Sequence, residues 1–353
     1  MYGIARAVGA AAADSNRTAF RRTEKKYKLY KAPTKPRQRR KDLIKTDLSN
    51  VVDFDLVLKA FNGGGETPPG VFRVQCGFGR PVFCFEDRPG FYFIPGALTV
   101  EEQCRWIRES LMDFPQPPNR TNHNVMYGPI HGLFDAVRDG KVLVEAESSD
   151  TDSHSRIFVF PEGSEDAGQG DSRNSIAASV LLRKLRWTTL GLQFDWSKRN
   201  YDVSFPHNKI PDELCLLAKK MAAPAMPLEE EFRPEAAIVN YFGPSDMLGG
   251  HLDDMEADWS KPIVSISLGC KAMFLLGGKS RNDSPIAMFL RSGDIVLMAG
   301  QARECYHGVP RIFTDEDNAD VSHITSQFSC KEDLCLSEYI RTSRININIR
   351  QVN

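Results

Sequence analysis

The chain has 353 residues, of which 41% are hydrophobic and 26% are charged, and its formal net charge is −1. These values are ordinary for a soluble globular protein and allow one large domain or two smaller ones. No apolar run approaches the roughly 20 residues needed to cross a bilayer, so we expect no membrane span and no membrane partner. The eight cysteines form neither a CxxC pair nor a regular framework, which favours reduced thiols in an intracellular compartment over a zinc site or a disulfide scaffold.

The N-terminal segment is strongly basic. Residues 1–41 contain thirteen Lys or Arg residues against only Asp14 and Glu24, a net charge of +11, so the rest of the chain carries −12. A basic arm on an acidic body indicates a polyanionic partner, an organelle address, or both. A solvated tail without either role is the alternative.

The arm begins with fifteen residues that are rich in Ala and Gly and resemble a mitochondrial presequence. A helix beginning at residue 20 would have an aromatic face formed by Phe20, Tyr27 and Tyr30. Proline interrupts the basic residues 31–41, a pattern typical of a disordered nuclear signal or a phosphate-binding arm. These features predict mitochondrial and/or nuclear localisation, with the cytoplasm as a further compartment.

A domain boundary is predicted near residue 75. Residues 62–70 contain three consecutive glycines and two prolines and form a linker-like break. We expect residues 1–75 to be a basic, partly disordered extension and residues 76–353 to be one domain. Within this domain, residues 145–176 are acidic and rich in Ser and Gly, so we expect a mobile loop there.

The domain begins with helical signals and continues with strand signals. Thr99 as N-cap and Glu102 three positions later predict a helix over residues 99–112. After residue 181, short β-branched runs alternate with Gly, Pro and Asn, which indicates a sandwich or a jelly-roll barrel. The predicted fold class is therefore α+β: a double-stranded β-helix (jelly-roll) barrel with supporting helices. The strand candidates include residues 236–242, 262–268, 272–276, 286–290, 294–298 and 343–351.

The pair His251 and Asp253 is the first candidate for chemistry. In an extended segment, side chains two positions apart point to the same face, so an imidazole and a carboxylate can reach one metal ion. His307 begins a later strand candidate and could supply a third ligand. Two imidazoles and one carboxylate leave three open positions on Fe(II), enough for a bidentate co-substrate and dioxygen. The alternative is a polar surface loop over residues 249–254.

The last strand candidate has an unusual alternation. Its odd positions, from 345 to 349, are all Ile, and its even positions are all polar. We expect the Ile face to pack against an outer layer and the polar face to line a cavity, because two Arg and two Asn on one side do not suit an ordinary edge strand. A guanidinium group binds a dicarboxylate well through paired charge-assisted hydrogen bonds. The polar positions are Arg344, Asn346, Asn348 and Arg350.

Together these motifs resemble the AlkB family of nucleic-acid dealkylases. Their order and the 56-residue separation of His251 and His307 agree with that family. The resemblance is dense over residues 187–353, sparser back to about residue 89, and strongest to the animal AlkB homologue one subgroup. The motifs are Asn240-Tyr-Phe, His251-x-Asp253, residues 262–269 and 274–278, Ser292-Gly-Asp294, Tyr306-His307-Gly, and Arg344-x-Asn346-x-x-x-Arg350.

The resemblance implies a residue-by-residue role in binding 2-oxoglutarate. Arg344 is expected to pair with the distal carboxylate of this co-substrate, helped by Asn240. Asn346 and Arg350 are expected near the end that chelates the iron. Phe242 stands where the family pattern usually has Tyr, so one hydroxyl contact to the co-substrate should be missing.

The resemblance also implies where a substrate base is held. Met255 stands where bacterial members have an acidic residue near the base, and Glu256 is a candidate to replace that residue. Trp196 is a candidate for the lid aromatic that stacks on a flipped base, although a core tryptophan fits the sequence almost equally well. Tyr201 is a further candidate contact.

The implied activity is that of a dioxygenase that uses Fe(II), 2-oxoglutarate and dioxygen. The expected substrates are N-methylated bases, 1-methyladenosine in tRNA and/or 6-methyladenine in DNA, and we expect a monomer with nucleic acid as its partner. Three alternatives remain: a protein (histone) demethylase or hydroxylase, an inactive RNA-binding barrel, and a cupin. Because the basic arm is hundreds of residues from the triad in sequence, we expect removal of residues 15–41 to leave 2-oxoglutarate decarboxylation unaffected.

Overall fold

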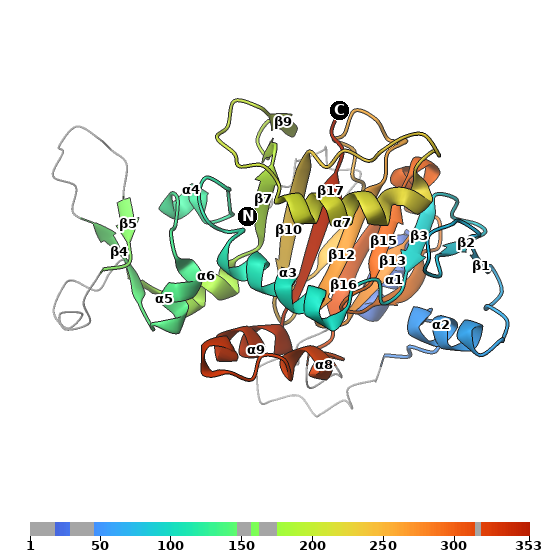
Figure 1. Cartoon of the computed structure of the whole chain (residues 1–353), viewed down its shortest axis with the longest axis horizontal. Helices are drawn as coiled ribbons and strands as arrows, with labels where there is room; N and C mark the ends of the chain where they lie inside the picture. Colours follow the sequence, from blue (N-terminus) through green and yellow to red (C-terminus); the bar gives the residue numbers. More distant parts are fainter. Residues whose placement is uncertain (1–17, 29–45, 147–156, 162–174, 315–318) are drawn as a thin grey trace.

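The computed structural model describes residues 18–28, 46–146, 157–161, 175–314 and 319–353 (Figure 1). Its centre consists of a large and a small β-sheet, and all pairings between their strands are antiparallel. The large sheet contains, in order, β1 (Val71–Arg73), β2 (Phe83–Phe85), β3 (Phe91–Ile94), β15 (Ile295–Met298), β12 (Ile263–Gly269), β17 (Arg344–Arg350), β10 (Ala236–Phe242) and β7 (Trp187–Gly191). The small sheet contains β11 (Leu248–His251), β16 (His307–Ile312), β13 (Ala272–Leu276) and β14 (Ile286–Leu290).

The two sheets share a hydrophobic core. One buried cluster combines Phe91, Phe242 and Val296 of the large sheet with Phe274 and Met288 of the small sheet. Antiparallel sheets that pack in this way are consistent with the predicted jelly roll. The six strand candidates of the sequence all correspond to observed strands, within one or two residues at their ends.

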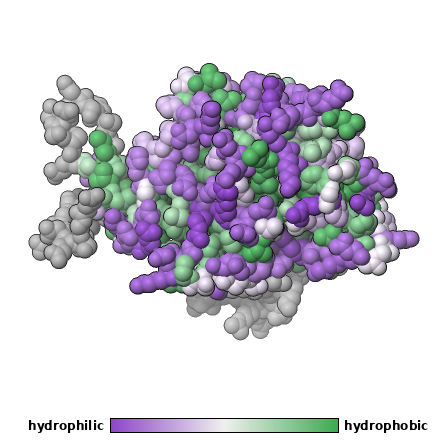
Figure 2. All heavy atoms as spheres, viewed as in Figure 1, coloured by the Kyte–Doolittle hydropathy of each residue, from purple (hydrophilic) through white to green (hydrophobic). Residues whose placement is uncertain are grey.

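Helices α3 (Val100–Met112) and α7 (Asp212–Ala222) cover the outer face of the large sheet (Figure 1). Helix α3 begins with a complete capping box between Thr99 and Glu102, as predicted. The Ile residues at positions 345, 347 and 349 are fully buried in one cluster with apolar side chains of both helices, which confirms the prediction for the Ile face of β17. The outward surfaces of the helices are mainly hydrophilic (Figure 2).

A smaller group of elements extends beyond the β7 edge of the large sheet (Figure 1). There β4 pairs with both β5 and β6. The predicted mobile loop at 145–176 lies largely outside the described residues. The group comprises α4 (Asn124–Tyr127), α5 (Leu133–Arg138), β4 (Val142–Ala146), β5 (Ile157–Val159), β6 (Ile176–Ala177) and α6 (Ala178–Lys184). The other elements are the β8–β9 hairpin (Gln193–Asp195 and Asn200–Asp202), η2 (Ala223–Ala225), η3 (Gly300–Glu304), α8 (Ser322–Thr325), η5 (Lys331–Asp333) and α9 (Leu334–Arg341).

The described parts of residues 1–75 pack against the sheets. Helix α2 (Phe54–Asn62) inserts Phe54 against Phe93, with 4.0 Å between the ring centroids, and its N-cap Asp53 forms an ion pair with Arg291. Strand β1 pairs with β2 across the predicted boundary at residue 75, which stays a prediction. The presequence-like segment and the basic residues 31–41 lie outside the described residues. Among the described residues, no helix is both long and apolar enough to span a membrane.

Helix α1 (Ala19–Tyr27) belongs to the basic arm and lies against β11 and β16. These are the strands that carry His251 and His307. This part of the arm is therefore close to the triad in the fold although it is far from it in sequence, and the expectation that removing residues 15–41 leaves decarboxylation unaffected stays a prediction.

Candidate metal and co-substrate site

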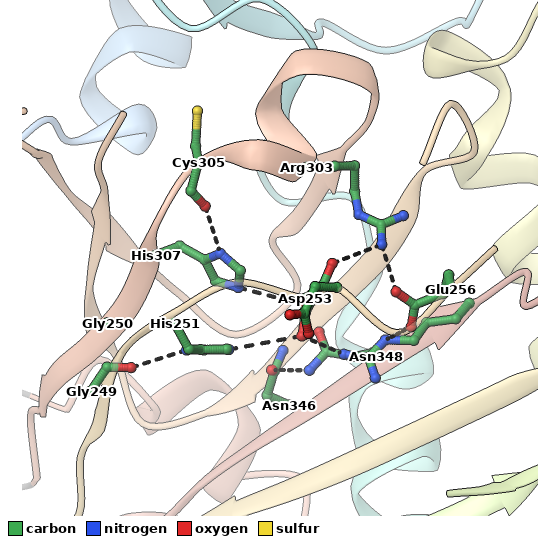
Figure 3. Close-up of polar contacts among 12 residues, drawn as sticks. Gly249, Gly250, His251, Asp253, Glu256, Arg303, Cys305, His307, Asn346 and Asn348 are labelled. Atoms are coloured by element: carbon green, nitrogen blue, oxygen red, sulfur yellow. Dashed lines mark hydrogen bonds and ion pairs between the residues drawn. The ribbon is translucent and has the colours of Figure 1, made fainter. Parts of the chain in front are cut away.

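The small sheet brings His251, Asp253 and His307 together (Figure 3). His251 ends β11 and faces His307, the first residue of β16, with 4.4 Å between the ring centroids. The carboxylate of Asp253 lies 3.9 Å from His251 Nε2 and 3.5 Å from His307 Nε2. One ligand atom from each residue lies within 4.8 Å of the others, so the three can hold a single ion.

Backbone carbonyl groups orient both imidazoles. His251 Nδ1 lies 3.0 Å from the carbonyl oxygen of Gly249, and His307 Nδ1 lies 3.2 Å from that of Cys305. Because a carbonyl oxygen can only accept, each Nδ1 donates a proton to its carbonyl and each Nε2 faces Asp253. This is the arrangement that tunes and orients histidine ligands in metal sites.

The electrostatics favour the protonation states that a metal ion requires. Burial and the neighbouring His307 lower the pKa of His251 to about 4. Burial alone would raise the pKa of Asp253, but Arg350, at 3.0 Å, and the two histidines outweigh it and hold that pKa well below its ordinary value. At neutral pH the site therefore offers a carboxylate and a neutral imidazole at His251. This donor set fits non-haem Fe(II).

Arg344 is a buried cation beside this site. Its side chain is on β17, only 1% of the residue is exposed, and burial lowers its pKa to about 10 against the opposing effect of Asp294. Its hydrogen bonds go to neutral groups, Ser267 Oγ at 3.2 Å and the Ile345 carbonyl at 3.3 Å, and Nε has no partner. No described carboxylate forms an ion pair with it. Since burying an unpaired charge costs several kcal/mol, the position fits an anionic ligand such as a carboxylate.

Polar side chains line the face of β17 between Arg344 and Arg350, and Arg350 contacts Asp253 of the triad. Asn240 lies opposite Asn346 in the register of β10 and β17, and Phe242 lies opposite Arg344. The Asn346 amide donates to Ser265 Oγ and to the Ile266 carbonyl, both at 2.9 Å, and Asn348 donates to Asn346 Oδ1 at 2.9 Å. The structure thus places all five residues predicted to bind 2-oxoglutarate on two adjacent strands. Phe242 contributes a ring 5.8 Å from the Arg344 guanidinium.

Glu256, which was predicted to contact a substrate base, lies in a buried network of ion pairs. Its side chain is 1% exposed and forms ion pairs with Arg303 at 2.5 Å and with Arg350 at 3.3 Å, while the Tyr201 hydroxyl donates to it at 3.0 Å. Both carboxylate oxygens are therefore occupied inside the protein. Arg350 links Glu256 to Asp253 of the triad, and a contact between Glu256 and a substrate base stays a prediction.

Arg303 has no signal in the sequence, yet it is 1% exposed and central to this network. Its guanidinium donates to the Asp253 carbonyl at 3.0 Å and to the Lys261 carbonyl at 3.1 Å, in addition to its ion pair with Glu256. It therefore fixes the backbone that presents Asp253 (Figure 3).

The β8–β9 hairpin carries the remaining predicted substrate residues. Trp196 follows β8, is 42% exposed, and packs its ring 4.8 Å from Phe194 and 5.2 Å from Trp187. The hairpin is tied to the site by Tyr201, whose hydroxyl accepts from Arg350 at 3.2 Å, and by an ion pair from Arg199 to Asp254. Trp196 therefore packs against aromatic neighbours while part of its side chain stays exposed.

The part of the chain that contains this donor set is similar in sequence to known proteins. Residues 163–350 match the model of the 2OG-Fe(II) oxygenase superfamily. A relative from Arabidopsis thaliana, named DNA N(6)-methyladenine demethylase ALKBH1A, is 62% identical over 340 residues, which cover 96% of this chain and 97% of the relative. The human nucleic acid dioxygenase ALKBH1 is 31% identical, covering 75% of this chain and 64% of its own. The tRNA demethylase abh1 of Schizosaccharomyces pombe is 28% identical, with coverages of 77% and 82%.

Proposed function

Since the chain belongs to the AlkB family within the 2OG-Fe(II) oxygenase superfamily, we propose that it oxidatively demethylates N-methylated bases in nucleic acid. One observation carries this proposal: the two-His, one-carboxylate donor set contacts Arg350, which lies on the same face of β17 as Arg344, a buried cation without a carboxylate partner among the described residues. A metal site alone would not need that cation. A metal site that also binds a dicarboxylate co-substrate does.

The proposed substrate is a methylated adenine, either 1-methyladenosine in tRNA or 6-methyladenine in DNA. The relatives reported above are named for 6-methyladenine in DNA, for nucleic acid and for tRNA. These names favour nucleic acid over the alternative of protein oxidation. The half-exposed ring of Trp196 supports a stacking contact with a base extruded from its helix.

The residues of the chain would act by holding and orienting the reactants. His251, Asp253 and His307 would hold Fe(II), which when bound couples the oxidation of 2-oxoglutarate by dioxygen to the hydroxylation of a methyl group. Arg344 would bind the distal carboxylate of 2-oxoglutarate, with Asn240 beside it. Arg350 would keep Asp253 ionised and directed at the ion. The hydroxylated methyl group then leaves the base nitrogen as formaldehyde, and 2-oxoglutarate is converted to succinate and CO2.

The proposal also covers the type of barrel, the oligomeric state and the localisation of the protein. The two packed sheets form a jelly-roll barrel, which the strand order supports. The protein acts as a monomer. It works in mitochondria and/or the nucleus, which the Ala- and Gly-rich start of the chain and the basic residues 31–41 support.

The test is mass spectrometry of nucleosides after incubation of the protein with Fe(II) and 2-oxoglutarate. The substrates are total tRNA and a DNA oligonucleotide that contains 6-methyladenine. We expect loss of a methylated adenosine from at least one of them, with formaldehyde released. Succinate formation without any change in the methylated nucleosides of either nucleic acid would contradict the proposal.

A further inference from the structure

Helix α1 buries an acidic residue and two aromatic residues against the small sheet. Phe20, Glu24 and Tyr27 are 0%, 2% and 3% exposed, whereas Lys25 and Lys26 face solvent. The buried residues are spaced four and three apart and so share one face of the helix. The helix therefore presents one closely packed face to the protein and a basic face to its surroundings.

The surface that receives Phe20 contains two glycines. A Cβ atom at Gly250 would overlap the Phe20 ring, and one at Gly277 would lie 2.8 Å from it. The Phe20 amide donates to the Arg281 carbonyl at 3.0 Å, and its ring centroid lies 6.5 Å from that of Tyr306. Gly250 directly precedes His251, and Tyr306 directly precedes His307. The ring thus packs on the residues next to both histidines.

Glu24 accepts a hydrogen bond from the irregular backbone beside His251. In the pairing of β11 with β16, Leu248 lies opposite Val309 and His251 lies opposite His307, so two residues, Gly249 and Gly250, face the single residue Gly308. Glu24 Oε1 accepts the hydrogen bond of the Gly250 amide at 2.6 Å, and Arg281 donates to the Gly250 carbonyl at 2.8 Å. An amide without an acceptor destabilises the backbone that carries it, so this contact stabilises the irregular segment.

We infer that Glu24 and Phe20 are positioning residues for the metal site, and that helix α1 fixes the backbone that presents His251. The other oxygen of Glu24 pairs with Arg21 of the same helix at 2.8 Å, which holds the carboxylate in place. The inference rests on the proposed function in so far as His251 is a metal ligand. It assigns a structural role to part of the basic arm that its charge alone does not indicate.

The test is the affinity of the purified protein for Co(II), measured by competition with a chelator in the absence of nucleic acid. Loss of a residue that orients a metal ligand costs about 10–100-fold in affinity, and Glu24 acts one step further away. We therefore expect Glu24→Ala to weaken Co(II) binding by about fivefold to tenfold. Glu24→Gln keeps an oxygen that can accept from Gly250, so it should stay within about twofold of the original protein.

Glu102→Ala is the matched control. It also removes a carboxylate that accepts a backbone hydrogen bond, from Thr99 at 2.8 Å, but at the start of α3 on the outer face of the large sheet. We expect this variant to keep the original Co(II) affinity even where it lowers the unfolding midpoint. Equal affinities for Glu24→Ala and Glu102→Ala, or a Glu24→Gln variant as weak as Glu24→Ala, would overturn the inference.

If Glu24→Ala does not fold, Phe20→Leu decides the question. It removes the ring that packs on Gly250 and Gly277, and it changes neither Glu24 nor any residue of the two strands that carry the histidines. Weaker Co(II) binding by this variant supports the role of α1, and unchanged binding overturns it. Because no nucleic acid is present, these results are independent of demethylation: failure on every methylated substrate would overturn the proposed function and leave this inference standing.

Discussion

At the scale of single residues, Arg344 and Arg350 share a strand but have different surroundings. Arg350 is neutralised by Asp253 and Glu256, at 3.0 and 3.3 Å, whereas Arg344 contacts a hydroxyl, a carbonyl and the ring of Phe242. A buried guanidinium tolerates such neutral surroundings only at a considerable cost in free energy, which a bound carboxylate would offset. The difference supports the proposed roles: ligand binding for Arg344 and support of the triad for Arg350.

Arg344→Ala should steeply raise the concentration of 2-oxoglutarate needed for half-maximal succinate formation. Loss of one side of a desolvated Arg–carboxylate pair costs about 2–5 kcal/mol, or roughly thirtyfold to several-thousandfold in affinity. Arg344→Lys should rescue this only in part, because an ammonium group lacks the planar fork of guanidinium. Arg108→Ala, which removes a surface arginine paired with Asp333, serves as control. A half-saturating concentration that Arg344→Ala does not change would assign the distal carboxylate to another residue.

At the scale of elements, β17 separates two environments. Its odd positions pack into the core beneath α3 and α7, and its even positions line the polar surface. The β8–β9 hairpin is joined to the same site through Tyr201 and Arg199. Stability and binding can therefore be perturbed separately on these elements.

Ile347→Ala should lower the free energy of unfolding by about 2–5 kcal/mol, because a fully buried Ile leaves a cavity when truncated. Chemical denaturation monitored by far-UV circular dichroism measures this change. Leu228→Ala, at a fully exposed position, should change the free energy of unfolding by less than about 0.5 kcal/mol. Equal stabilities of the two variants would show that the outer face of β17 is not packed as described.

Trp196→Ala should weaken the binding of a methylated oligonucleotide by about 1–3 kcal/mol, the usual contribution of one base stacked on an aromatic ring. The half-saturating concentration of 2-oxoglutarate should not change, because Trp196 is not on the polar face of β17. Val203→Ala changes a 76% exposed residue just after the same hairpin and is the matched control. If both variants bind the oligonucleotide with equal affinity, Trp196 contributes to packing and not to base binding.

At the scale of the whole molecule, periodic patterns could be predicted from the sequence and tertiary pairings could not. The two-residue spacing of His251 and Asp253 predicted that their side chains point to the same face. The alternation of residues 344–350 predicted which face of the strand packs into the core. The ion pair of Glu256 with Arg303 could not be predicted because Arg303 is 47 residues away and belongs to no pattern. The docking of α1 was missed because only the fold places Gly250 and Gly277 around Phe20.

The structural role of α1 changes how the charge of the basic arm should be tested. Deleting residues 15–41 would also remove Glu24 and Phe20, so we favour the double variant Lys25→Ala, Lys26→Ala on the exposed face of the helix. If these lysines bind phosphates, the log–log salt slope of nucleic-acid binding should flatten by about 0.7–0.9 for each phosphate that is no longer neutralised, while Co(II) affinity stays unchanged. Lys59→Ala, in α2, is the control. Identical salt slopes would show that Lys25 and Lys26 do not contact phosphates.

The most direct test of the proposed oxidative demethylation is the ratio of succinate formed to methyl groups removed on one oligonucleotide, prepared with and without its N-methyl groups. We expect about one succinate for each methyl group removed, little succinate with the unmethylated oligonucleotide, and neither product from a folded Asp253→Ala variant, which keeps only two imidazole ligands. Equal succinate formation with both oligonucleotides and no removal of methyl groups, or a fully active Asp253→Ala variant, would contradict the account.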